Sequence, residues 1–331
     1  MSQPLVSINI PVFKCEKYVY RCLESVKNQT YKNLEIILIN DATPDNSIEI
    51  IEGFFKENPD LNYRLIHNET NEGLSVVRNK GIENSAGKYI YMLDSDDYIT
   101  PYCIEKLVQV SEKENSDITL GETICLDSKD NEEKMLFPIR TKASSFTGNE
   151  IILNQFFEKQ WPIIAPNKLY KRDWVMKNNL RFVKGLFSQD ELWSFHCAFK
   201  LEKIAFLKEV TYIYFLHGES TIFNRTKRNF ENYQTILEYF AKTYQESNQT
   251  IQKLILKKMV QFKEMVLIMQ WKALRGDVEY MKENYARMKL LPQLSLGDYI
   301  GNSFDWKTKK LSFFQNLPNS LGVKLFIRRF G

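Results

Sequence analysis

Apolar and polar positions follow two different periods along the first 120 residues. Short apolar runs, typical of strands, span residues 5–12, 34–40, 63–67 and 89–93. Stretches with helical spacing alternate with them, at residues 18–29, 45–57, 74–85 and 101–115. The run 34–40 is apolar almost throughout, as expected of a central strand in a parallel sheet that is buried on both faces. The pattern therefore predicts an α/β fold with a mostly parallel sheet and helices on both faces.

The alternation decays beyond residue 118, and a different pattern begins near residue 228. Residues 212–216 are the last strand-like run. Residues 228–291 read as long helices, because apolar positions repeat at helical spacing with lysines between them. These apolar positions include Leu254, Ile255, Phe262, Met265, Val266 and Met269. We therefore predict a helical extension at the C-terminal end of the α/β domain.

The formal net charge of +4 conceals an uneven distribution along the chain. Residues 251–331 carry 15 Lys and Arg against 6 Asp and Glu, whereas the rest of the chain carries 30 against 35. A basic tail on a slightly acidic body predicts either an anionic surface or partner for the tail, or simply a solvated helical face. We expect no nucleic-acid partner, because the basic residues form no recognised binding motif.

Cysteine usage and the lack of long apolar runs bear on location. The chain has five cysteines in no CxxC pair, and an odd, scattered set argues against a disulfide framework. No basic segment precedes the first apolar run, and no stretch approaches 18 uncharged apolar residues, so neither export nor a membrane span is predicted. We expect a cytoplasmic protein.

The strand-like run 89–93 ends abruptly in a cluster of carboxylates. Asp94, Asp96 and Asp97 fall within four positions at the carboxyl end of the strand, where open parallel sheets bind their ligands. Carboxylates at short range raise each other's pKa, so a cluster of ionised carboxylates usually has a cation bound beside it. Mg²⁺ or Mn²⁺ would suit these oxygen ligands and would combine them with substrate phosphates. The alternative is a solvated acidic turn in which Asp97 caps a helix.

A second strand ends in polar residues and indicates a shared pocket. Asn40 and Asp41 follow the apolar run 34–40, although the turn-forming residues after them also suit a plain turn. A nucleotide would need basic side chains for its phosphates, since neither GxGxxG nor GxxxxGK[ST] occurs. Arg78 and Lys80 lie on a predicted helix between the two strands and could supply them, or could be surface charges.

These residues match a known family over about residues 5–220. The matching blocks read "VSINIPVFKCEKYVYRCLESVKNQTYKNLEIILINDATPDNS" and "NEGLSVVRNKGIENSAGKYIYMLDSDD", followed more weakly by "PNKLYKRDWV" and "FSQDELWSF". With these blocks the chain resembles the inverting family 2 glycosyltransferases of the GT-A fold. It is most similar in kind to bacterial enzymes that make capsule, exopolysaccharide or O-antigen. The resemblance implies a Rossmann-like GT-A domain.

The resemblance implies a donor and metal site at the carboxylate cluster. Asp94, Ser95 and Asp96 correspond to the DxD motif, in which Asp96, helped by Asp94 or Asp97, holds Mn²⁺ or Mg²⁺ on the diphosphate of a nucleotide sugar. His217 falls where some relatives place a residue near the diphosphate, and it is a further candidate metal ligand. A lone His is otherwise a partly buried polar residue.

The resemblance also implies contacts with the base of the nucleotide, usually uracil. Asp41 would accept a hydrogen bond from the base, Pro11 and Phe13 would line its pocket, and Arg78 would assist the nucleotide. The chain departs from the commoner pattern in reading PVFK for PVYN and in carrying Asn40 where an Asp is usual.

Inverting sugar transfer needs a carboxylate that takes the acceptor hydroxyl proton, worth about 10²–10⁴-fold in rate. By resemblance Asp190 is this base, and Glu191 is the reserve candidate because Gln189 stands where a Glu usually precedes the base. On the residues alone, this triplet also suits the polar face of a helix.

The basic tail has the ingredients of an interfacial segment. Several basic residues near an anionic leaflet could hold the protein at the inner face of the cell membrane, at roughly 1 kcal/mol each. The residues concerned are Phe313, Phe314, Phe326 and Phe330 with Lys307, Lys309, Lys310, Lys324, Arg328 and Arg329. The alternative is a folded helical cap or a homodimer contact.

Together these observations predict an inverting, metal-dependent glycosyltransferase. We expect it to move a sugar from a nucleotide sugar, with UDP as the expected nucleotide, to a hydroxyl of a cell-surface glycan or lipid-linked oligosaccharide. Residues 1–225 would form the GT-A domain, with a nucleotide-binding half at 1–118 and an acceptor half at 119–225. Residues 226–331 would form the helical, basic extension. The alternatives are a sugar-phosphate nucleotidyltransferase and a catalytically silent nucleotide- or glycan-binding module.

Overall fold

A computed structural model describes residues 3–129, 132–218, 226–274 and 276–330. The chain divides into two compact units, Met1–Ser220 and Thr221–Gly331, which we describe separately. The predicted boundary at residue 225 lies outside the described residues.

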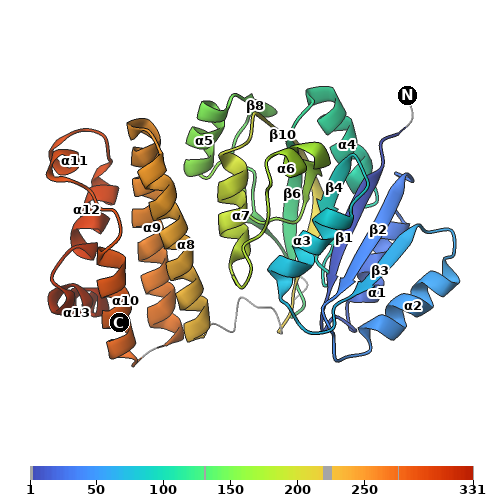
Figure 1. Cartoon of the computed structure of the whole chain (residues 1–331), viewed down its shortest axis with the longest axis horizontal. Helices are drawn as coiled ribbons and strands as arrows, with labels where there is room; N and C mark the ends of the chain where they lie inside the picture. The colour runs from blue at the N-terminus through green and yellow to red at the C-terminus, as the bar shows by residue number, and fades with distance from the viewer. Residues whose placement is uncertain (1–2, 130–131, 219–225, 275, 331) are drawn as a thin grey trace. The chain divides into compact units, whose positions relative to one another are not determined.

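The first unit is built on one large mixed sheet with strand order β3-β2-β1-β4-β9-β6-β10-β5 (Figure 1). Four parallel neighbours, β3, β2, β1 and β4, form one half of the sheet, and β10 pairs in parallel with β6 in the other. Strand β9 is antiparallel to both β4 and β6 and joins the two halves. The first six strands are β1 Val6–Val12, β2 Leu34–Asn40, β3 Tyr63–His67, β4 Tyr89–Met92, β5 Tyr98–Ile99 and β6 Ile118–Asp127. The others are β7 Glu133–Phe137, β8 Ser145–Thr147, β9 Lys168–Lys171 and β10 Lys203–Leu216.

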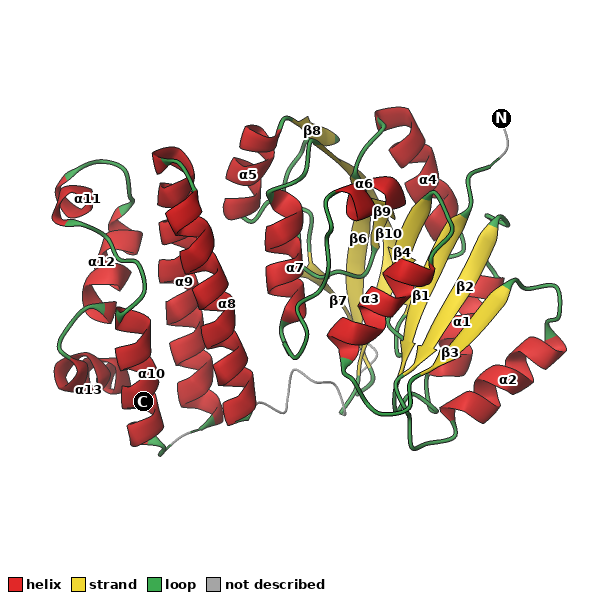
Figure 2. Cartoon of the chain, in the orientation of Figure 1, coloured by secondary structure: helices red, strands yellow, loops and turns green. Residues whose placement is uncertain are grey.

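Helices cover both faces of this sheet, as Figure 2 shows. Successive side chains of a strand point to opposite faces. On β2, Ile36 and Leu38 join the core cluster that contains α1, α2 and α4, whereas Ile37 and Ile39 pack with Val77 of α3. The helices are α1 Val19–Lys27, α2 Ser47–Glu57, α3 Leu74–Asn84, α4 Cys103–Glu114, α5 Asn149–Phe157, α6 Arg172–Lys177 and α7 Gln189–Ala198. The predicted α/β fold with helices on both faces is confirmed.

The region in which the sequence pattern decays is part of the same sheet. The predicted last strand at 212–216 is the end of the 14-residue strand β10, and β6 lies beside it. Strand β10 is irregular in its pairing, with register shifts between Phe206 and Val210 and between Val210 and Tyr212. These irregularities break the period-2 pattern, which explains why the sequence pattern showed only the end of the strand.

The second unit is helical, as the apolar spacing predicts. Its helices are α8 Lys227–Glu246, α9 Gln249–Ala273, α10 Val278–Lys289, α11 Leu296–Ile300, α12 Trp306–Gln315 and α13 Asn319–Phe330. Between α8 and α9 the Asn248 side chain accepts a hydrogen bond from the Ile251 N–H, which caps α9. Over the stretches of chain that the structure describes, no helix combines the length and the apolar character needed to cross a membrane.

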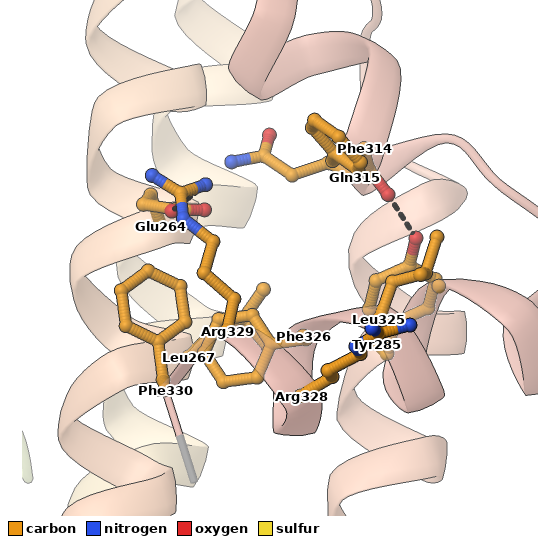
Figure 3. A pocket seen from close by; sticks show the side chains of 11 residues that line it. Glu264, Leu267, Tyr285, Phe314, Gln315, Leu325, Phe326, Arg328, Arg329 and Phe330 are labelled. Carbon is orange, nitrogen blue, oxygen red and sulfur yellow. Dashed lines mark hydrogen bonds and ion pairs between the residues drawn. The ribbon is translucent and has the colours of Figure 1, made fainter.

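A cavity of about 230 Å³ lies inside the second unit, among helices α9, α10, α12 and α13 (Figure 3). Phe314, Phe326 and Phe330 line it; Phe326 is buried, and the other two aromatics are half-buried. Glu264 also lines it and lies 3.5 Å from the Arg329 guanidinium. Burial raises the pKa of Glu264, and Arg329 opposes this shift only in part.

Candidate active site

Polar residues gather where the parallel strands end. Strands β1 and β2 run side by side to Val12 and Asn40, and the Asp41 N–H donates to the Val12 carbonyl at 3.0 Å. Strand β4 lies on the other side of β1, and the "DSDD" loop follows it directly. The two polar strand ends therefore meet at one edge of the sheet, where ligands bind in open α/β folds.

The last carboxylate of the "DSDD" loop faces the protein interior. Asp97 is 1% exposed, and its carboxylate accepts hydrogen bonds from the Tyr212 hydroxyl at 2.6 Å and the Phe215 N–H at 2.8 Å. Burial, together with the neighbouring Asp96 and Asp94, raises the pKa of Asp97 well above its usual range. Asp97 thus fastens the loop to strand β10, and its carboxylate is turned away from solvent.

Helix α1 holds the same loop from the opposite side. The Arg21 guanidinium donates to the Asp96 carbonyl at 3.0 Å and stacks 3.8 Å from the centre of the Phe215 ring. The Cys22 thiol lies 3.6 Å from the Asp94 carbonyl. Ser95 is also buried. The loop backbone is therefore fixed, while the Asp96 side chain remains 36% exposed.

Arg78 joins two carboxylates that are far apart in the sequence. Its two terminal nitrogens lie 2.8 Å from Asp94 Oδ1 and 2.6 Å from Asp190 Oδ1, and its side chain is only 3% exposed. Burial raises the pKa of Asp94, and the charge of Arg78 counters that shift. The planar guanidinium suits this double contact, because its fork presents donors in two directions.

Helices α3 and α7 set the position of this bridge. Ser75 on α3 donates to the Gln189 side chain on α7 at 2.6 Å, next to the Arg78–Asp190 contact. The side chain of Asp190 is 29% exposed, whereas Glu191 is buried with 7% exposure. Of these two candidate bases, Asp190 is thus the more accessible to a substrate.

His217 and Asp96 form a pair at the exposed edge of the loop. His217 Nε2 and Asp96 Oδ2 are 3.1 Å apart, and the Tyr18 ring stacks on the imidazole at 4.3 Å. Adjacent ligands of an octahedral cation lie about 3 Å apart when each is about 2.1 Å from the metal. This spacing is that of a hydrogen bond, and it also matches two neighbouring ligands of one cation. Of the two donors, the Asp96 carboxylate suits Mg²⁺ or Mn²⁺, whereas the His217 imidazole suits Mn²⁺ rather than Mg²⁺, which prefers oxygen ligands.

Any such cation would draw few ligands from the chain. Across the described residues, no group of three or more His, Cys, Asp or Glu side chains is arranged to hold a metal ion. Mg²⁺ commonly takes one or two protein ligands and completes its shell with phosphate oxygens and water. The His217–Asp96 pair matches that kind of site.

The buried Asp41 carboxylate accepts hydrogen bonds from the loop at residues 68–73. It accepts from the Asn68 amide at 2.8 Å and from the Glu72 and Gly73 N–H groups at 2.8 and 2.9 Å. A carboxylate offers about four acceptor positions, so these three donors leave about one for a ligand. Asp41 is 3% exposed, whereas Phe13, at the end of β1, is 42% exposed and open to stacking.

The structure thus brings most of the predicted site residues to one edge of the sheet. Pro11, Phe13 and Asp41 lie at the ends of β1 and β2, and Asp94, Asp96, Arg78, Asp190 and His217 form a connected group. Sequence reasoning missed Tyr18, Arg21 and Tyr212, which hold the loop and the imidazole. No local pattern marks them, because their contacts join segments 75 to 199 positions apart.

A search of protein-family models matches residues 7–178 to "Glycosyl transferase family 2". That match spans more than half of the chain. The chain belongs to glycosyl transferase family 2. Curated relatives of this family-2 chain bear glycosyltransferase names: it is 32% identical to "Putative glycosyltransferase EpsH" of Bacillus subtilis, over 75% of this chain and 71% of that protein. It is 31% identical to "Uncharacterized glycosyltransferase YibD" of Escherichia coli, over 65% of this chain and 62% of that protein.

Solved structures confirm the GT-A fold predicted from the sequence. S. aureus TarS 1–349, crystallised with UDP-GlcNAc, superposes with a TM-score of 0.71 over 98% of this chain and 91% of that chain, at 17% identity. The mannosyltransferase PcManGT from Pyrobaculum calidifontis, in complex with GDP-Man and Mn²⁺, gives a TM-score of 0.56 at 12% identity, over 98% of this chain and 87% of that one. This family-2 chain is thus a glycosyltransferase with an α/β domain and a helical C-terminal region.

Proposed function

We propose that this glycosyltransferase transfers a sugar with inversion from a UDP-sugar to a hydroxyl of a cell-surface glycan or lipid-linked oligosaccharide, using Mn²⁺ or Mg²⁺. The observation that carries the proposal is the Arg78 bridge, which holds Asp190 and Asp94 on one guanidinium. The Arg78 side chain would thereby hold the proposed general base, Asp190, close to Asp94 of the DxD motif. A donor sugar bound between them would have its acceptor and its leaving group on opposite sides.

The "DSDD" loop would hold the metal and the donor diphosphate. Asp96 and His217 would be ligands of the cation, and Asp94 would assist from its place beside Arg78. When bound, the divalent cation would neutralise charge on the departing diphosphate as a Lewis acid. Ser95 would contribute through its backbone, because its side chain is buried.

The ends of β1 and β2 would receive the base of the nucleotide. Phe13 would stack on the base and Pro11 would line its pocket, because Pro11 is a half-buried residue near the end of β1 and Phe13 follows the strand directly, with 42% exposure. Asp41 would use its remaining acceptor position for a base N–H, while its other bonds hold the 68–73 loop in place. The related fold of TarS, whose structure contains UDP-GlcNAc, supports a uridine nucleotide.

Asp190 would act as the general base. As the acceptor oxygen forms its bond to the sugar, the bond from the sugar to the diphosphate breaks, and the hydroxyl proton moves to the Asp190 carboxylate. Arg78 would keep that carboxylate oriented from one side, leaving its partly exposed oxygen for the acceptor. Glu191 is the reserve candidate, but its burial gives an acceptor less access to it.

The remaining partners and the location complete the proposal. The enzyme would work in the cytoplasm, in keeping with its five free cysteines, and at the inner face of the membrane where lipid-linked acceptors lie. The second unit would provide the membrane contact, with a homodimer contact as the alternative use of that unit. Residues 119–225 would contribute the acceptor side, and the nucleotidyltransferase alternative loses its support through the family membership.

Calorimetric titration of UDP, with Mn²⁺ and then with EDTA, tests the division of roles. Asp96→Ala should abolish metal-dependent binding, because it removes the most exposed metal ligand. Asp190→Asn should bind UDP as the wild type does and lose about 10²–10⁴-fold in transfer, because the amide cannot take a proton.

Asp173→Asn is the matched control, since its side chain is 90% exposed and lies outside the site. Equal loss of UDP affinity in Asp96→Ala and Asp190→Asn would contradict the assignment. Wild-type binding of UDP without transfer to any acceptor and without donor hydrolysis would point to the silent binding module instead.

A further inference from the structure

The second unit exposes an unusual set of large apolar side chains. Leu290, Leu296, Ile300 and Trp306 are 87, 82, 86 and 77% exposed, and Phe313 is 56% exposed. All five fall within a stretch of 24 residues, from the end of α10 to α12. Scattered single apolar residues are normal on a protein surface, but a group of this size in one short segment marks an interaction site.

Helices α11 and α12 are neighbours, and we call the exposed apolar side chains of residues 290–313, together with the lysines among them, the α11–α12 surface. Leu296 and Ile300 are four positions apart on α11, so they share a side, and no residue of α11 is buried. The hydroxyl of Tyr299 donates to Ser312 at 3.0 Å, which ties α11 to α12. Figure 1 shows the two helices next to each other within the second unit.

On α12 the exposed and buried positions separate cleanly. Trp306 and Phe313 are seven positions apart, two helical turns, and therefore lie on the same side of the helix. The buried positions Thr308, Leu311, Ser312 and Gln315 lie on the other side. The exposed apolar side chains thus have no place in the core of the unit.

The ionisable side chains of residues 290–313 are three lysines and two aspartates, so the net charge of this surface is +1. Lys307 and Lys310 are exposed next to Trp306 and Phe313. The two aspartates cap helices. Asp298 forms a capping box with Ser295 at the start of α11, and the Asp305 side chain accepts a hydrogen bond from the Thr308 N–H at the start of α12. Exposed Leu, Ile and Trp followed by lysines beside the Trp is a composition that suits a segment lying in a membrane interface.

We propose that the α11–α12 surface binds the surface of an anionic lipid bilayer. The apolar side chains would enter the boundary between headgroups and acyl chains, while Lys307 and Lys310 would contact lipid phosphates. The biological reason for such binding rests on the proposed function, since a lipid-linked acceptor lies at a membrane. The binding itself follows from exposure and charge alone.

This surface overlaps only in part with the tail that the sequence suggested. It keeps Phe313, Lys307 and Lys310 of the predicted set and adds Leu290, Leu296, Ile300 and Trp306. Phe314, Phe326 and Phe330 line the pocket in Figure 3, where Arg329 lies 3.5 Å from Glu264. The proposed bilayer contact therefore centres on α11 and α12 and leaves out α13.

Co-sedimentation of the full chain with vesicles tests the proposal. Vesicles of phosphatidylcholine alone should bind the wild type roughly tenfold more weakly than vesicles that also contain phosphatidylglycerol. Leu296→Ser/Ile300→Ser, Trp306→Ala and Lys307→Glu/Lys310→Glu should each lower partition onto the anionic vesicles by roughly tenfold. Ile151→Ser, which alters a 53% exposed isoleucine on α5 of the first unit, is the matched control and should leave partition unchanged.

Three outcomes would overturn the proposal. The wild type would show no preference for anionic vesicles, or the three variants would bind them as the wild type does, or light scattering would show a wild-type dimer that the same substitutions dissociate. Calorimetry with UDP separates this proposal from the proposed function. Normal UDP binding with no vesicle binding rejects only the bilayer contact, and vesicle binding without UDP binding rejects only the donor assignment.

Discussion

Arg78 links two carboxylates of the candidate site, Asp94 and Asp190. A guanidinium with 3% exposure between two carboxylates forms a buried ionic group, and such groups are costly to break because the partners are left uncompensated. A buried ion pair is weak evidence for stability, and in our proposal this one orients its partners. With the proposed roles it would couple the donor side at Asp94 to the acceptor side at Asp190, so a substitution of Arg78 should slow the transfer step.

We expect Arg78→Lys to lower kcat by about 10²-fold while changing UDP affinity less than tenfold. An ammonium is a compact charge on a flexible stem and cannot hold both carboxylates in the geometry of the planar fork. Steady-state kinetics and UDP titration measure the two effects. Arg181→Lys is the control, because the ion pair of Arg181 with Glu83, 3.4 Å long, lies outside the candidate site. An unchanged kcat with a large loss of UDP affinity would make Arg78 a nucleotide ligand instead.

Helix α9 has a lysine, Lys263, at a buried position that would ordinarily hold an apolar residue. Lys263 is 3% exposed, and its ammonium nitrogen lies 3.4 Å from the Pro292 carbonyl. Burial lowers the pKa of Lys263 from 10.5 to about 8. The unfolded chain, with the higher pKa, therefore binds more protons than the folded unit between these two values.

It follows that the stability of the second unit should rise as the pH increases from about 8 to 10.5. Below pH 8 the folded unit carries the buried charge, at a cost on the order of 3 kcal/mol. Lys263→Met should therefore stabilise the unit at pH 7 and flatten its stability over that window. Denaturant unfolding at several pH values measures this, with Lys272→Met, at the end of the same helix, as the control. Parallel pH curves for wild type and Lys263→Met would contradict the expectation.

At the scale of the whole molecule, the two compact units carry different tasks in our proposals. The first unit contains the candidate donor and acceptor residues, and the second contains the α11–α12 surface and the cavity of about 230 Å³. A ligand stabilises only the unit that binds it, by about 2.7 kcal/mol at 100 times its dissociation constant. The division of labour therefore has a thermodynamic signature.

Calorimetric melting of the full chain should show two transitions. UDP with Mn²⁺ should raise the temperature of one transition only, and Lys263→Met at pH 7 should raise the other. Adding EDTA should reverse the first shift, because the donor contact depends on the cation. A single transition that responds to both changes would mean that the units unfold together.

Local patterns in the sequence predicted the elements and the type of chemistry. The apolar run at residues 34–40 indicates a buried strand, and the "DSDD" cluster indicates a carboxylate-rich strand end. Both features can be read locally, because they involve residues that are neighbours in the chain. The family resemblance supplied the candidate base at Asp190. The strands from β6 to β9 escaped prediction, since short and irregular strands leave a weak period-2 signal.

What the sequence alone determined is the α/β class and the helical extension, and it also supplied the candidate site residues. Only the tertiary structure decided how they meet: Arg78 reaches Asp94, 16 positions away, and Asp190, 112 positions away, and His217 reaches Asp96 across 121 positions. It also decided that Asp97 faces inward and that Trp306 faces solvent. The physical reason is that periodicity records the environment of each residue, whereas contacts between distant segments depend on strand register and helix packing.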